Sequence, residues 1–175
     1  ARELQSLGAV VINADDLGRE VVERDRKVLQ TLKVAFGSDI VGSNGKLDRR
    51  KLGARAFASD ETTNQLNRIV HPALLALLRK TIAEQRRAKK TKLLVVDAAL
   101  IYNWKLDREL DVVIVVDSTR SNQLARLQKQ GISRREALQR MKRQIPKYRL
   151  RRMADAVIHN NGTPEQLVHK TWRLY

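Results

Sequence analysis

No cysteine occurs in this chain of 175 residues, which excludes disulfide bonds, thiolate metal ligands and a cysteine nucleophile. Aromatic residues make up only 4% of the chain, so few rings are available to stack on the bases of single-stranded nucleic acid. No apolar run approaches the roughly 18 residues of a membrane-spanning helix, and no signal peptide is visible. We therefore expect a cytoplasmic protein without a membrane partner; an organellar location stays open, because the true N-terminus is not visible.

Acidic residues are scarce in two stretches, although the whole chain carries 19 of them against 35 Lys and Arg. Glu136 is the only acid between residues 120 and 152, and Glu84 is the only acid between residues 79 and 92. The net charge of +16 and its uneven distribution favour a polyanionic partner: nucleotide phosphates, nucleic acid or an anionic surface. A helix face kept charged for solubility is the alternative, and it fits residues 120–152 less well.

Short apolar runs predict strands at residues 10–12, 93–96, 112–116 and 156–158, most of them covered on both faces of a sheet. Helical patterns separate the strands. They lie at residues 21–36, at 64–88 with a break at His71-Pro72, from Ser118-Thr119 to 127, and from a capping box at Ser133 and Glu136 onward. Strands that alternate with helices indicate an α/β fold with a parallel sheet.

We expect residues 1–175 to form one domain. The interval from about 22 to 90 is too long for a simple crossover and predicts an inserted helical subdomain. The basic stretch of about 119–153 predicts a helical lid.

The first predicted strand ends in short polar residues, and a helical pattern begins around Leu17. Such a strand delivers a carboxylate, Asp15, to the sheet edge at which α/β proteins build their active sites. A carboxylate there can reach the proton of a substrate hydroxyl and act as a general base. Capping of the following helix is the alternative role for Asp15.

Several short motifs follow one another in a specific order and spacing. They are residues 7–15 with 19–22, 45–49 with Leu52, Gly53 and Phe57, 70–72, 97–102, Gln123 with Arg126 and Leu127, Arg140 with 144–146, 154–158, and 160–162. In this order they resemble the dephospho-coenzyme A kinases, P-loop kinases of the nucleoside-monophosphate-kinase type, over nearly the whole chain. The resemblance implies a three-layer P-loop NTPase-type parallel sheet with helices on both faces, an inserted helical substrate subdomain and a basic helical lid.

The resemblance also implies a reaction: transfer of the γ-phosphoryl group of ATP to the ribose 3′-hydroxyl of dephospho-coenzyme A, with Mg²⁺. In that reaction Asp15 would accept or orient the proton of the hydroxyl, and Arg140 would stabilise the transferring phosphoryl group. The implied substrate-binding residues are Arg19, His71 and Leu100. The implied nucleotide-binding residues are Arg126, Arg140, Asn160 and Gly162, and no residue is assigned as a metal ligand.

Purely structural roles remain open as alternatives for several of these residues. A surface salt bridge or a solvated side chain is the alternative for Arg126 and Arg140. A structural hydrogen bond at a helix entry is the alternative for His71, and a plain turn is the alternative for residues 160–162.

Four features depart from the family pattern. There is no G-x-x-x-x-G-K-[ST] loop, which would cradle the ATP phosphates and supply a Mg²⁺ ligand. We expect this loop and the central strand before it to be truncated from the sequence, because a sheet without its middle strand leaves two rows of unpaired backbone groups. The others are Asn13 and His159, where aspartate is usual, and residues 99–103, where a proline-led, glutamate-ended loop is usual.

These departures keep two other hypotheses open. The first is a non-catalytic domain that binds RNA or a ribonucleoprotein through its basic clusters. The second is a kinase of similar fold that acts on another nucleotide or small hydroxyl substrate.

Overall fold

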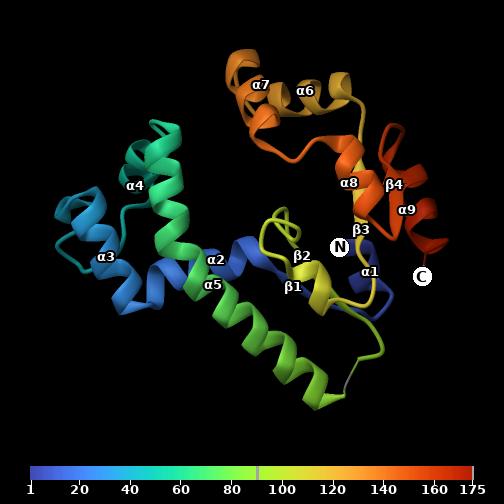
Figure 1. The fold of residues 1–175 in the computed structure, drawn as a ribbon, viewed down its shortest axis with the longest axis horizontal. Coiled ribbons are helices and arrows are strands. Elements are labelled where there is room, and N and C mark those ends of the chain that lie inside the picture. Colours follow the sequence, from blue (N-terminus) through green and yellow to red (C-terminus); the bar gives the residue numbers. More distant parts are fainter. Residues whose placement is uncertain (90, 175) are drawn as a thin grey trace. The chain divides into compact units, whose positions relative to one another are not determined.

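The computed structural model describes residues 1–89 and 91–174 (Figure 1). They divide into two compact units, one within residues 1–98 and the other within residues 99–174. Each unit contains one pair of parallel strands. The predicted α/β class with parallel strands and helices is therefore confirmed. The single domain, the substrate subdomain and the lid stay predictions.

The first unit is built mainly from helices. Its elements are α1 (Arg2–Ser6), β1 (Val10–Asn13), α2 (Ala14–Arg24), α3 (Arg26–Phe36), η1 (Ser38–Ile40), α4 (Arg49–Ala56), α5 (Asp60–Ala88) and β2 (Leu94–Asp97). Strands β1 and β2 pair in parallel, with Val10 opposite Leu94 and Asn13 opposite Asp97. Helices α2, α3 and α4 pack against the long helix α5, which is green in Figure 1. Leu32, Ile40 and Leu78 are completely buried in this unit.

Two helix predictions in the first unit are wrong. Residues 21–36 are not one helix, because the chain is extended at Asp25, whose carboxylate accepts hydrogen bonds from the amides of Lys27 and Val28 and caps α3. Pro72 does not start a helix after a break at His71; it lies inside α5. Proline removes one backbone hydrogen bond there, but Val70 and Leu74 are buried on the same side of α5 and hold the two halves against the core.

The second unit carries the basic residues 120–152. Its elements are η2 (Leu106–Glu109), β3 (Ile114–Asp117), α6 (Arg120–Lys129), α7 (Arg134–Arg143), α8 (Lys147–Met153), β4 (Ala156–His159) and α9 (Pro164–Trp172). Strands β3 and β4 pair in parallel, and Asp117 lies opposite His159. Helices α6 and α7 pack on each other, α8 packs on β3, and α9 packs on β4.

The predicted helix starts in this unit are largely confirmed. Thr119 and Ser133 cap α6 and α7 by accepting hydrogen bonds from the amides of Asn122 and Glu136. The carboxylate of Glu136, predicted to complete a capping box, accepts a hydrogen bond from Arg140 instead.

Strand β3 is not covered on both faces as predicted. Ile114 and Val116, on one face of the strand, are exposed, as is Val112 just before it. No helix in residues 1–89 and 91–174 combines the length and apolar character needed to cross a membrane.

Candidate active site

Asn13, the last residue of β1, determines how α2 begins. Its side-chain oxygen accepts hydrogen bonds from the amides of Asp15 at 2.8 Å and Asp16 at 3.2 Å, so the helix starts at Ala14 and not near Leu17. This gives the unusual asparagine a structural role, and it makes the capping alternative for Asp15 wrong.

The carboxylate of Asp15 is exposed in the first turn of α2. It has no hydrogen-bond or ion-pair partner in the part of the chain that the structure describes. An exposed carboxylate at the carboxyl end of a parallel strand can accept a proton from a bound hydroxyl group.

Asp97 is a second exposed carboxylate at the same strand edge, with no role predicted from the sequence. It ends β2 and lies opposite Asn13 in the parallel register. The signal that could have identified it is an acidic residue directly after the apolar run of residues 93–96. No group of three or more His, Asp or Glu side chains suited to a metal ion occurs within residues 1–89 and 91–174.

The predicted substrate-binding residues occupy different settings. Arg19 lies one turn after Asp15 on α2 and forms an exposed ion pair with Asp16 at 2.9 Å. His71 is half-buried in the middle of α5, and burial lowers the pKa of its imidazole. Leu100, in the second unit, is half-buried in a turn in which its carbonyl accepts a hydrogen bond from the amide of Trp104. Their binding roles stay predictions.

In the second unit, the structure brings together two of the predicted nucleotide-binding residues. The Arg126 guanidinium donates to the backbone oxygen of Asn160 at 3.0 Å and to its side-chain oxygen at 3.1 Å. Gly162 follows in the same turn, where a Cβ atom would lie 1.7 Å from the side-chain oxygen of Gln166. Because Gln166 completes the capping box of α9, a larger residue at position 162 would displace the Gln166 side chain from that cap.

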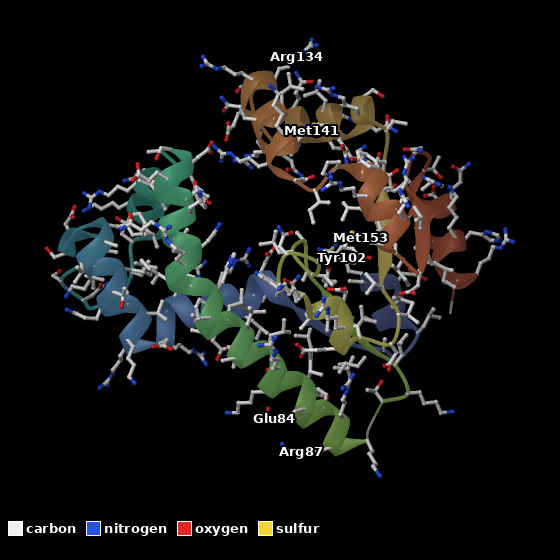
Figure 2. The ribbon with its side chains drawn as sticks, in the orientation of Figure 1. Glu84, Arg87, Tyr102, Arg134, Met141 and Met153 are labelled. Carbon is white, nitrogen blue, oxygen red and sulfur yellow. The ribbon has the colours of Figure 1, made fainter. Side chains whose placement is uncertain are left out.

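Arg140 lies on α7 and pairs with Glu136 at 2.7 Å, one turn earlier. An exposed pair of this spacing is worth about 0.3–0.5 kcal/mol, so the guanidinium can leave it for a phosphate at little cost. An open depression on the same helix is lined by Arg134, Arg135, Leu138, Gln139 and Lys142. Figure 2 labels Arg134 at the start of α7.

The sequence predicted no role for Asp117, which is a buried acid. Its carboxylate is 5% exposed and accepts hydrogen bonds from Arg151, whose Nε lies at 2.9 Å, while Lys147 Nζ lies at 3.5 Å and His159 Nδ1 at 3.8 Å. Burial alone would raise the pKa of Asp117, but the hydrogen bond from Arg151 and the charge of Lys147 outweigh it and lower the pKa. The signal was an acid that ends an apolar run just before a long basic stretch.

The chain is similar to one protein family and to solved structures over most of its length. The family described as dephospho-CoA kinase matches residues 1–166. A dephospho-CoA kinase of Geobacter sulfurreducens is 39% identical over 176 residues, which cover 100% of this chain and 89% of that protein. One from Corynebacterium diphtheriae is 37% identical over 179 residues, with the same two coverages.

Solved structures share the fold. The crystal structure of TT1252 from Thermus thermophilus matches with a TM-score of 0.76 and 26% identity, covering 99% of this chain and 86% of that one. A dephospho-CoA kinase from Campylobacter jejuni matches with a TM-score of 0.70 and 22% identity, covering 97% of this chain and 85% of that one. This second similarity concerns the fold alone. From the family match and the two relatives it follows that this chain belongs to the dephospho-CoA kinase family.

Proposed function

We propose that the protein transfers the γ-phosphoryl group of ATP to the ribose 3′-hydroxyl of dephospho-coenzyme A, giving coenzyme A and ADP. The observation that carries the proposal is Asp15, an exposed carboxylate held at the end of β1 by the Asn13 cap in a member of this kinase family. The hypothesis of RNA binding has no support from the relatives, whose names point to the kinase.

The chemistry at Asp15 follows from its position. Its carboxylate accepts a hydrogen bond from the 3′-hydroxyl, which orients the oxygen toward the γ-phosphorus. As the new O–P bond forms, the bond from the γ-phosphorus to the β–γ bridging oxygen breaks and ADP leaves. The hydroxyl proton passes to Asp15 and then to solvent. Transfer of this kind depends mainly on positioning and on neutralising charge.

Cationic side chains of the second unit supply the neutralisation in this proposal. Arg140 contacts the transferring phosphoryl group, and Arg126, Asn160 and Gly162 bind the nucleotide. The hydrogen bonds between Arg126 and Asn160 support a shared role, and the weak, exposed pair between Arg140 and Glu136 supports a guanidinium that is available to phosphate. Residues of about 119–153 are the lid that brings Arg126 and Arg140 to ATP.

Arg19, His71 and Leu100 bind dephospho-coenzyme A, and residues of about 22–90 are the substrate subdomain. The place of Arg19 one turn after Asp15 supports contact with a substrate phosphate. Magnesium bound with ATP would screen the phosphate charge. Asp97 fits as a ligand donor, since Mg²⁺ in such sites takes one or two carboxylates together with phosphate oxygens.

The test is a phosphorylation assay of the full-length protein with ATP, Mg²⁺ and dephospho-coenzyme A, read by mass spectrometry and phosphorus NMR. We expect coenzyme A that carries the new phosphate on the ribose 3′ position. Adenosine and AMP serve as parallel acceptors. Phosphorylation of another acceptor but not of dephospho-coenzyme A would favour a different small-molecule kinase, and no transfer to any acceptor would contradict kinase activity.

A further inference from the structure

Asp117 connects the two ends of the basic segment of the second unit. It is the last residue of β3, and Ser118 and Thr119 separate it from α6. Its cationic partners Lys147 and Arg151 lie in α8, at the other end of the basic segment. Lys147 and Arg151 are four residues apart and therefore lie on the same side of α8. One buried carboxylate thus contacts both the first and the second helical turn of α8.

The end of β3 also holds the turn after β4. The backbone oxygen of Asp117 accepts a hydrogen bond from the amide of Asn160 at 2.7 Å, and Ser118 Oγ donates to the backbone oxygen of Asn160 at 3.0 Å. Lys147 donates to the backbone oxygen of Ser118. The amide of Thr119 donates to the side-chain oxygen of Asn161 at 2.7 Å. The hydrogen bonds around Asp117 and those around Asn160 therefore form one continuous network.

The charge of Asp117 makes displacement of the groups in this network energetically costly. A buried carboxylate is costly unless cations and hydrogen bonds satisfy it, so displacement of α8 from β3 would leave an uncompensated charge. Charge-assisted hydrogen bonds are also roughly twice as strong as neutral ones. The position of α8 and of Ser118 therefore depends on Asp117, and Ser118 in turn holds the carbonyl of Asn160 that Arg126 contacts.

We infer that Asp117 is a positioning residue for ATP: by holding Lys147 and Arg151, it keeps the turn of residues 160–162 and Arg126 in the arrangement that binds the nucleotide. This inference rests on the proposed function. Asp117 itself is buried and acts through Asn160 and Arg126.

The test compares Asp117→Asn with Asp155→Asn. Asp155 is a matched control, because it is an acid near the opposite end of β3 whose carboxylate accepts a hydrogen bond from the amide of Val113 at 2.7 Å. We expect Asp117→Asn to raise the KM and the Kd for ATP by about tenfold, the effect of losing one charge-assisted hydrogen bond, with the KM for dephospho-coenzyme A within about twofold of wild type. Asp155→Asn should leave both KM values within about twofold.

Further variants keep the test decisive. Asp117→Glu, which preserves the charge, should recover part of the ATP affinity. Arg151→Gln removes the ion pair with Asp117 by changing its partly exposed partner. This variant should show the same loss of ATP affinity without a loss for dephospho-coenzyme A, and it replaces Asp117→Asn in the test if Asp117→Asn does not fold. Unchanged ATP affinity, or an equal loss for ATP and dephospho-coenzyme A, would overturn the inference. The Kd for ATP, measured by calorimetry without acceptor, tests it even if the natural acceptor is a different molecule.

Discussion

The two units of the molecule use different interactions around the same kind of strand pair. In residues 1–98, helices α2, α3, α4 and α5 enclose Leu32, Ile40 and Leu78, which are fully buried. In residues 99–174, the described buried apolar side chains are Leu106, Val113, Ala137 and Ile158, whereas Val116 on β3 is 58% exposed. The second unit instead buries the polar residues Asp117 and Ser118 at the end of β3.

This difference indicates two sources of stability. Burial of apolar side chains contributes on the order of 25 cal/mol per Å². It holds α2, the helix that carries Asp15, against α3 and α5. In the second unit, a buried carboxylate with cationic partners holds the strand ends and the turn at Asn160. Truncation of apolar side chains should therefore affect the first unit most, and neutralisation of charge should affect the second.

The largest expected effect on the free energy of unfolding is that of Leu78→Ala in α5. Removal of a fully buried leucine side chain costs about 2–5 kcal/mol, because the cavity closes only in part. Val34→Ala is the control, since Val34 is 81% exposed and belongs to the same unit. Amide hydrogen exchange, resolved by peptide, should show faster exchange in α2, α3 and α5 for Leu78→Ala alone. Equal protection in the two variants would mean that these helices do not depend on this core.

Asp117→Asn should have an intermediate effect that depends on pH. We expect it to lower the free energy of unfolding by about 1–3 kcal/mol at pH 7, since its partners Lys147 and Arg151 are partly exposed. The folded protein lowers the pKa of Asp117 below the ordinary value of 3.8. Its ionised form therefore stabilises the fold above that pH, and this contribution is lost as the pH falls through the lowered pKa.

Urea titrations at pH 7 and near pH 3 would measure this difference. The signal from Trp104 and Trp172 reports the second unit, where both tryptophans lie. A constant difference between wild type and Asp117→Asn across this range would show that the charge of Asp117 is not what stabilises the unit.

Val116→Thr should have the smallest effect on the free energy of unfolding, a change within about 0.5 kcal/mol, because the side chain is exposed on β3. Val113→Thr, at a buried position just before the strand, is the contrasting variant and should lower the free energy of unfolding by more than Val116→Thr does. Urea midpoints of the two variants make the comparison. A loss for Val116→Thr as large as that for Val113→Thr would show that this face of β3 is covered in the protein.

Local signals predicted much of this architecture. Apolar runs predicted β1 to β4 to within one or two residues, and hydroxyl side chains predicted the starts of α6 and α7. The position of Asp15 at a strand end also followed from the sequence alone. These features depend on residues that are close together in the chain.

Features that depend on distant residues were missed. The continuity of α5 through Pro72 depends on the packing of Val70 and Leu74 against other helices. The burial of Asp117 depends on Arg151, 34 residues later. Nothing in the local sequence distinguishes Arg151 from the other cations of the basic stretch.

The most direct test of the central claim is the turnover of Asp15→Asn with ATP and dephospho-coenzyme A, beside Asp16→Asn as the matched control. Asp16 is the neighbouring exposed acid, and it pairs with Arg19. We predict that kcat of Asp15→Asn falls by about 10²–10⁴-fold, the usual contribution of a general base, while the Kd for ATP changes by less than about twofold. Asp16→Asn should retain most of the turnover. Turnover of Asp15→Asn equal to that of wild type would contradict the assignment of Asp15 to the phosphoryl-transfer step.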